Sequence, residues 1–172
     1  MPELIPVLKK DDIEHMVVQV ASRISSDYQE RELVLIGVLK GAYVFLSDLA
    51  RQMSIPAQVD FIGISSYGAD TSSSGKIRLT KDIDIDIKNK DVLIIEDIVD
   101  TGLTLSYIVE YLESFSPKTI KVCALIDKRE RRKSKVKIDY ACHLTDEGFL
   151  VGYGLDYSED YRNLPDIYHL KL

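Results

Sequence analysis

The chain has 172 residues, of which 45% are hydrophobic and 29% are charged, and its formal net charge is −6. We expect a single domain over residues 1–172, because a chain of this length buries a sufficient core without disulfide or metal support. The negative charge disfavours a protein that coats nucleic acid. No apolar run approaches the roughly 18 residues of a membrane helix, and the start of the chain lacks the pattern of a signal peptide. We therefore expect a cytoplasmic protein that binds neither nucleic acid nor membrane.

The spacing of the apolar residues predicts helices and strands that alternate along most of the chain. Helical spacing of apolar residues predicts helices at 12–28, 42–53 and 103–115. Continuous or alternating apolar runs predict strands at 33–39, 57–65, 77–88, 91–96, 119–126, 138–143 and 148–153. Residues 66–76 are polar and aperiodic, which predicts a mobile loop. This order favours an α/β fold with a mostly parallel central sheet flanked by helices. The first and last segments fit the core pattern less well and are expected to form a small hood together.

The two cysteines of the chain are Cys123 and Cys142. Both lie in apolar runs and they lack the spacing of a metal or redox motif, so we expect buried free thiols.

The most informative segment is Val92–Thr104, in which an apolar strand runs into Glu96 and Asp97 and then into a small loop with hydroxyl side chains. Backbone N–H groups of a tight loop before a helix form a cradle for an anion, and the helix dipole assists them. Carboxylates at the strand end accept hydrogen bonds from sugar hydroxyls and attract a divalent cation. The segment therefore predicts a site for a phosphorylated ribose with Mg²⁺. An alternative is an acidic turn in which Asp100 caps the helix, but this leaves Glu96 and Asp97 without a role.

Ligands of such sheets bind at the carboxyl ends of the strands. The loops after Leu39, Glu96 and Ile126 begin at such ends, so functional residues are expected there.

The run from Glu96 to Thr104, E-D-I-V-D-T-G-L-T, resembles the signature of the type I phosphoribosyltransferases, and in particular that of the hypoxanthine (hypoxanthine-guanine) branch. The resemblance extends in the same order to Leu39-Lys40-Gly41, Ser66-Tyr67, Lys128-Arg129, the segment 149–157 and Arg162. It implies a type I phosphoribosyltransferase-like fold and Mg²⁺-dependent transfer of 5-phosphoribosyl from phosphoribosyl pyrophosphate to N9 of hypoxanthine or guanine. It further implies a homodimer or homotetramer.

The resemblance also implies a role for each matching residue on the sugar-phosphate side. Glu96 and Asp97 would meet the ribose and the metal, with Asp156 as a further metal-associated carboxylate. Asp100 would be the general base near N7 of the purine, a position where a carboxylate can take a proton. The 5-phosphate would lie on Asp100, Thr101, Gly102, Leu103 and Thr104. Some family members have a lysine where this chain has Leu103, so backbone donors and hydroxyls would carry more of the phosphate binding here.

For the pyrophosphate, the matching residues are Leu39, Lys40 and Gly41, with a cis peptide bond before the lysine, and Arg162, whose fork suits phosphate oxygens. Ser66 and Tyr67 match a lid loop that excludes water.

For the purine, Lys128 offers donors only, so it can bond a 6-oxo group but opposes the 6-amino group of adenine. Phe149 would stack on the base, the backbone of Leu150 would read its edge, and Asp156 would lie beside them.

Several alternatives remain open. Lys128 is also the first charge of the basic run 128–137, of which we expect Arg129 to Lys137 to be surface, and Phe149 could be an ordinary core aromatic. The alternating aspartates of 82–86 are expected on the solvated face of a strand. Rival functions are a phosphoribosyltransferase for xanthine or a pyrimidine, and a regulator of the same fold that senses phosphoribosyl pyrophosphate and binds nucleic acid.

Overall fold

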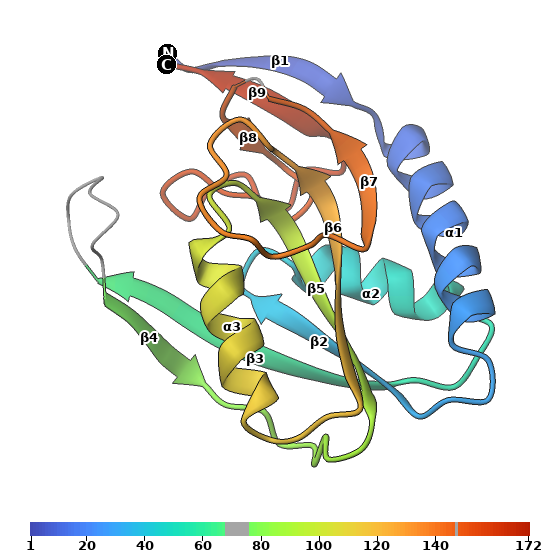
Figure 1. Cartoon of the computed structure of the whole chain (residues 1–172). Helices are drawn as coiled ribbons and strands as arrows, with labels where there is room; N and C mark the ends of the chain where they lie inside the picture. The colour runs from blue at the N-terminus through green and yellow to red at the C-terminus, as the bar shows by residue number, and fades with distance from the viewer. Residues whose placement is uncertain (68–75, 147) are drawn as a thin grey trace.

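The computed structural model describes residues 1–67, 76–146 and 148–172. Its centre is a six-stranded sheet of order β4-β3-β2-β5-β6-β7 (Figure 1). The strands are β2 (Leu33–Leu39), β3 (Gln58–Tyr67), β4 (Lys76–Lys81), β5 (Asp91–Val99), β6 (Thr119–Asp127) and β7 (Tyr140–Leu144). All neighbours pair in parallel except β3 and β4, which are antiparallel. The predicted α/β fold with a mostly parallel sheet is confirmed.

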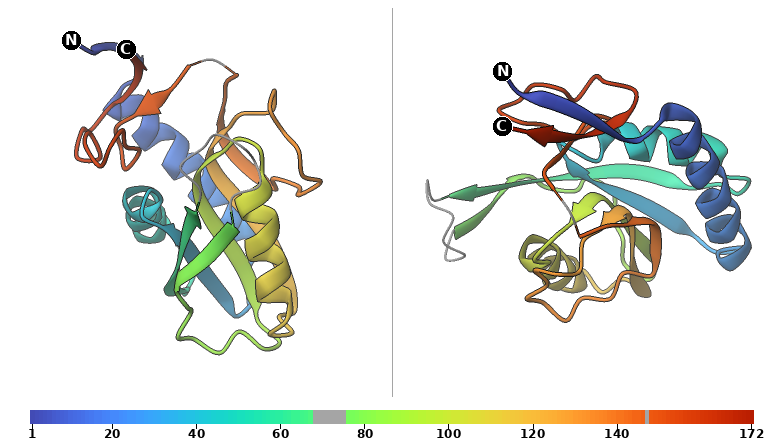
Figure 2. Two further views of the ribbon diagram at one scale, coloured as in Figure 1. Left: turned by 90° about the vertical axis from the view of Figure 1, so that its left-hand side faces the viewer. Right: turned by 90° about the horizontal axis from the view of Figure 1, so that it is seen from above.

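Helices cover both faces of this sheet. They are α1 (Lys10–Asp27), α2 (Tyr43–Gln52) and α3 (Leu103–Glu113). Along β2, Leu33 and Leu35 pack in the cluster that contains the apolar residues of α1 and α2. The intervening Val34 and Ile36 pack in the cluster that contains Leu105 and Ile108 of α3. Figure 2 shows α3 on one side of the sheet and α1 and α2 on the other. Because both faces are buried, the central strands are continuous apolar runs.

The expected hood is confirmed. Strands β1 (Glu3–Leu8), β9 (Ile167–Lys171) and β8 (Leu150–Val151) form a second sheet of order β1-β9-β8. Glu3 pairs with Lys171, so the two ends of the chain lie side by side above the main sheet (Figure 1). The hood therefore contains both terminal segments of the chain. It also contains the segment between β8 and β9, which reaches the carboxyl edge of the main sheet.

The three predicted helices and the predicted core strands are confirmed with small shifts of their ends, and β5 continues past Glu96 to Val99. The strand predicted at 148–153 is shorter, because the backbone turns at Gly152 and Tyr153 with φ of 98° and 52°. Ser66 and Tyr67 end β3 and Lys76 begins β4, so these residues belong to strands and not to the predicted loop. The remainder of that loop, 68–75, lies outside the described residues.

The prediction of a strand to residue 88 was wrong, since β4 ends at Lys81. Asp60 is 6% exposed, and its carboxylate accepts hydrogen bonds from the backbone N–H groups of Asp84 and Ile85 at 2.7 and 2.9 Å. These contacts use donors that a strand would present to its neighbour. Burial alone would raise the pKa of Asp60, but the backbone hydrogen bonds outweigh it and lower that pKa.

Both cysteines are free, as expected; Cys123 is buried, whereas Cys142 is only half-buried. In the described part of the chain, no helix is both long and apolar enough to cross a membrane.

Candidate active site at the carboxyl edge of the sheet

The chain leaves β2 and β5 in opposite directions across the sheet. These strands are neighbours, but β2 continues through α2 to β3 on one side, and β5 continues through α3 to β6 on the other. Such a reversal opens a crevice at the carboxyl ends of the two strands, which is where α/β sheets bind their ligands. The loop at 39–41 follows β2 and the loop at 100–102 follows β5, so both predicted phosphate-binding loops lie at this crevice.

The loop at residues 39–41 packs closely against Asp97 and Gly154. A Cβ on Gly41 would lie 1.8 Å from Asp97 Oδ2, and a Cβ on Gly154 would lie 2.3 Å from the carbonyl oxygen of Gly41. Gly154 also has a φ of 98°, which favours glycine. The peptide bond between Leu39 and Lys40 is cis, as the resemblance implied. The structure therefore brings the predicted pyrophosphate loop against the predicted metal carboxylate.

The predicted phosphate loop turns directly into α3. Gly102 is the residue before the helix, with a φ of 79°, and its carbonyl accepts a hydrogen bond from Ser106 N at 2.9 Å. Gly102, and not Asp100, therefore occupies the N-cap. Leu103 N donates to Thr101 Oγ1 at 3.3 Å. A cavity of about 200 Å³ lies here, lined by Glu96, Ile98, Val99, Asp100, Thr101, Gly102, Thr104 and Leu105. The start of a helix with glycine and hydroxyl groups around a cavity is suited to a phosphate.

A second cavity, of about 230 Å³, adjoins the first. It is lined by Val38, Leu39, Lys40, Gly41, Ile64, Glu96, Asp97, Thr104, Asp156 and Arg162. Glu96 and Thr104 line both cavities. The structure thus gathers residues from β2, β5, α3 and the hood around one divided space.

Glu96 and Asp97 place two carboxylates next to each other, and a cation between them would stabilise their charged forms. Burial raises the pKa of Glu96 well above its usual value, and the negative charge of Asp97 raises it further. Burial also raises the pKa of Asp97, although the backbone N–H of Ile98 donates to its carboxylate at 2.7 Å. Across the described residues, no three His, Cys, Asp or Glu side chains converge into a complete metal cage. Mg²⁺ needs no such cage, because it retains waters and binds one or two carboxylates together with substrate phosphates.

Two polar atoms at this site are buried without a hydrogen-bond partner in the described part of the chain. They are Asp100 Oδ1 and Arg162 Nε. The rest of the Arg162 guanidinium donates to the carbonyl of Gly154 at 2.7 Å and lies 3.4 Å from Asp156 Oδ1. Buried polar groups are nearly always paired in native proteins. The unpartnered acceptor and donor therefore indicate groups that a ligand would satisfy.

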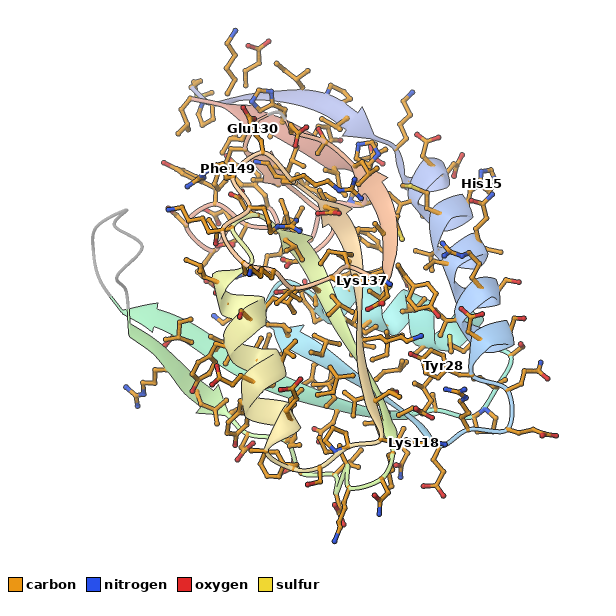
Figure 3. The ribbon with its side chains drawn as sticks, in the orientation of Figure 1. His15, Tyr28, Lys118, Glu130, Lys137 and Phe149 are labelled. Carbon is orange, nitrogen blue, oxygen red and sulfur yellow. The ribbon has the colours of Figure 1, made fainter. Side chains whose placement is uncertain are left out.

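The predicted base-binding residues lie between the end of β6 and the hood. Lys128 Nζ donates to the carbonyl of Gly148 at 2.9 Å, and its backbone N–H donates to the carbonyl of Val99 at the same distance. Phe149 is 52% exposed, with its ring edge-on to Tyr157 at 5.8 Å, and Figure 3 shows it beside the hood strands. The core alternative for Phe149 is therefore wrong. Leu150 is buried in β8, paired with His169.

The predicted lid residues Ser66 and Tyr67 lie at the end of β3, where they pair with Ile77 and Lys76 of β4. Their side chains and residues 68–75 lie outside the described part of the structure.

The expectation that Arg129 to Lys137 are all surface residues was wrong for Arg132, whose side chain is 19% exposed and pairs with Asp127. Sequence reasoning missed Asp127 as well, which is 1% exposed at the end of β6. A carboxylate that ends a buried strand needs a charged partner, and that requirement was the available signal.

Comparison with known proteins agrees with this site. A family model described as phosphoribosyl transferase domain matches residues 7–158. The hypoxanthine-guanine phosphoribosyltransferase of Aquifex aeolicus is 45% identical over 94% of this chain and 92% of its own length, and that of Bacillus subtilis is 43% identical over 96% and 92%. A hypoxanthine phosphoribosyltransferase structure from Staphylococcus aureus has a TM-score of 0.93 at 42% identity, covering 96% of this chain and 90% of its own. The chain belongs to the phosphoribosyltransferase family, in its hypoxanthine-guanine branch.

Proposed function

We propose that this protein is a cytoplasmic purine salvage enzyme that transfers 5-phosphoribosyl from phosphoribosyl pyrophosphate to N9 of hypoxanthine or guanine. The products are the nucleoside 5′-monophosphate and pyrophosphate. The observation that carries the proposal is the divided cavity at the carboxyl edge, where Glu96 and Thr104 separate a phosphate-sized space from one lined by Lys40 and Arg162. Its relatives named hypoxanthine-guanine phosphoribosyltransferase support the same reaction.

Each part of the substrate has a proposed partner. The 5-phosphate lies against residues 100–104 at the start of α3, and the ribose hydroxyls meet Glu96 and Asp97. The pyrophosphate lies over residues 39–41 and Arg162, whose Nε is buried without a described partner. The purine stacks on the exposed ring of Phe149 and accepts a hydrogen bond at its 6-oxo group from Lys128.

The reaction forms a bond between N9 and C1′ and breaks the bond between C1′ and the pyrophosphate oxygen. Asp100 accepts the proton that the purine loses, and its negative charge also stabilises the positive charge that develops at C1′. Lys128 holds the base so that N9 faces C1′. Ser66 and Tyr67 belong to a lid that excludes water from the activated ribose.

The residues present fit Mg²⁺. Glu96, Asp97 and Asp156 line one cavity and would supply oxygen ligands to the ion. When bound, Mg²⁺ neutralises charge on the leaving pyrophosphate.

A nucleic-acid-binding regulator is the less supported alternative, because four cations of the basic run pair with carboxylates of the same chain. Lys128 bonds Gly148, and Arg131 pairs with Asp100 at 3.2 Å. Arg129 and Arg132 pair with Asp127, and Lys137 lies 3.8 Å from Asp139. These contacts reduce the positive charge that a nucleic acid would meet.

The test is a base-specificity profile. The purified protein is mixed with Mg²⁺, phosphoribosyl pyrophosphate and one of hypoxanthine, guanine, xanthine, adenine or uracil, and nucleotide and pyrophosphate are measured. We expect turnover with hypoxanthine or guanine and little with adenine. Tight binding of phosphoribosyl pyrophosphate without turnover of any base would overturn the proposal in favour of a sensor.

We also propose a homodimer or homotetramer, which light scattering of the purified protein would test.

A further inference from the structure

The end of β6 carries a buried ion pair that reaches into the proposed active site. Asp127 is 1% exposed, and its carboxylate accepts hydrogen bonds from Arg132 Nη2 and from Arg129 Nε, the latter at 3.1 Å. The two arginines differ in exposure, since the Arg132 side chain is 19% exposed and that of Arg129 is 68% exposed. Asp127 thus fixes one guanidinium inside the protein and holds the other at its surface.

The Arg132 guanidinium also contacts three backbone carbonyls. Its Nε donates to Asp100 O at 3.0 Å, and its Nη2 donates to Lys128 O at 3.1 Å and to Val99 O at 3.5 Å. Asp100 is the proposed general base, and Lys128 is the proposed contact of the 6-oxo group. One side chain therefore bonds the backbone of both the proposed general base and the proposed contact of the 6-oxo group.

This contact lies where the regular sheet ends. Pairing between β5 and β6 reaches Val99 and Asp127, and Asp100 and Lys128 are the next residues of the two strands. Beyond that point one backbone hydrogen bond joins the two chains, from Lys128 N to Val99 O at 2.9 Å, and the guanidinium adds a bridge between the carbonyls of Asp100 and Lys128. The planar fork of arginine presents donors in several fixed directions, whereas a lysine ammonium is a point charge on a flexible stem.

The residues after Arg132 also form hydrogen bonds to the backbone of the phosphate loop. Lys133 N and Ser134 N both donate to Thr101 O, at 2.8 and 3.2 Å. A Cβ on Gly102 would lie 2.3 Å from Ser134 Oγ and 3.1 Å from Arg132 Cδ. The segment 132–134 is thus packed directly behind the loop that carries Asp100.

We propose that Arg132 is a positioning residue that sets the separation of Asp100 and Lys128, and with it the placement of the purine over the ribose. This inference rests on the proposed function. Catalysis by positioned groups is sensitive to displacements of about 1 Å, which lower rates by about 100-fold. Loss of the fork would let Asp100 shift relative to Lys128, while β5 and β6 retain their pairing up to Val99 and Asp127.

The experiment compares Arg132→Lys and Arg132→Met with Arg129→Met, a matched control that removes a cation from the same carboxylate without touching Asp100 or Lys128. Circular dichroism and thermal unfolding establish folding. Steady-state kinetics with Mg²⁺-phosphoribosyl pyrophosphate then give kcat and KM for hypoxanthine and the ratio of kcat/KM between hypoxanthine and adenine. We expect both Arg132 variants to lose about 100-fold in kcat, to raise KM for hypoxanthine and to change the base ratio. Arg129→Met should keep all three near the wild-type values.

A purely structural role gives a different result, because loss of folded protein scales all rates equally and leaves KM and the base ratio unchanged. That result for Arg132→Lys would overturn the inference, as would equal effects of Arg129→Met and Arg132→Met. If Arg132→Met fails to fold, Arg132→Lys decides, since it keeps a cation beside Asp127. Failure of the proposed function is distinct, because the wild-type protein would then turn over no purine.

Discussion

Arg131 Nη1 lies 3.2 Å from Asp100 Oδ2, so the carboxylate proposed to take the proton is held in an ion pair. The Arg131 side chain is 67% exposed, and exposed pairs contribute little to stability because solvent screens them. The other oxygen, Oδ1, is buried without a partner in the described structure. The pair therefore orients Asp100 with one oxygen fixed and the other available to a ligand.

Asp100→Asn should lower kcat by about 100- to 10,000-fold, the usual contribution of a general base, because the amide cannot accept the proton. The dissociation constant of Mg²⁺-phosphoribosyl pyrophosphate, measured by calorimetry, should change much less. Asp84→Asn is the control, since this exposed carboxylate pairs with Lys81 far along the chain from the loop. Equal losses in turnover and binding would instead assign Asp100 a structural role.

Lys128→Gln should relax the rejection of adenine. The ammonium donates to Gly148 O and retains further donors for a 6-oxo group, whereas a glutamine oxygen can accept from a 6-amino group. A hydrogen bond to a charged group contributes about 1.5–3 kcal/mol, so the ratio of kcat/KM for adenine over hypoxanthine should rise about 10- to 100-fold. Lys135→Gln, in the same basic run, should leave the ratio unchanged. An unaltered profile for Lys128→Gln would contradict the base contact.

Gly41→Ala should weaken the binding of Mg²⁺ and phosphoribosyl pyrophosphate. The added Cβ would lie 1.8 Å from Asp97 Oδ2, so the carboxylate or the loop must move. Disturbing groups around a metal site lowers affinity by about 10- to 100-fold, and titration calorimetry would measure the change. Gly37→Ala is the control, because its Cβ would meet the apolar side chains of Leu46 and Phe61 at 2.6 and 3.1 Å and no carboxylate of the site. Similar losses in both variants would contradict a specific fit at Gly41.

Glu96→Gln should stabilise the metal-free protein, and increasingly so as the pH rises. Burial and then Asp97 raise the pKa of Glu96, so the folded state keeps a proton that the unfolded chain loses near its usual value of 4.5. The wild type therefore loses stability as the pH rises through the folded pKa. The difference in melting temperature between Glu96→Gln and wild type should be small near pH 4 and grow towards pH 8. Glu113→Gln, at an exposed position, is the control. A melting-temperature difference for Glu96→Gln that stays constant with pH would contradict the raised pKa of Glu96 as its cause, as would a difference for Glu113→Gln that grows with pH.

Neither cysteine should react readily in the native protein. Burial raises the pKa of the Cys142 thiol to about 12 and that of Cys123 well above its usual value, so little reactive thiolate is present at pH 7.5. Iodoacetamide labelling followed by mass spectrometry should find both thiols unmodified until the chain is unfolded in guanidinium. Rapid labelling of the native protein at the rate of the unfolded control would contradict this prediction.

The fold was predictable where burial shapes the sequence directly. Strand β2 and the start of β5 are apolar on both faces, and the helices repeat their apolar residues, so both kinds of element are apparent without a structure. Residues 82–87 show the limit. Their isoleucines do pack inward, with Ile83, Ile85 and Ile87 in the cluster of α3, but Asp60 binds the backbone and prevents a strand.

The candidate site was predictable where it is contiguous in sequence. Glu96 to Thr104 forms one strand end and one loop, so its chemistry is visible in a single run of residues. The bridge from Arg132 to Asp100 was not predictable, because it depends on how far two strands extend and on which of several adjacent cations turns inward. The fit of Gly41 against Asp97 likewise joins positions 56 residues apart, which only the parallel pairing of β2 and β5 brings together.

The pairing of β1 with β9 has a consequence for how the protein is made. Leu4 lies opposite Leu170, so β1 has to wait for a strand that is synthesised after the whole central sheet. At about 5–20 residues per second this delay is roughly 10 to 30 s. During that time the six-stranded sheet can already assemble, whereas Phe149, Asp156 and Arg162 follow its last strand in chain order. A nascent chain would therefore acquire its phosphate loop well before the parts proposed to hold the purine and the leaving group.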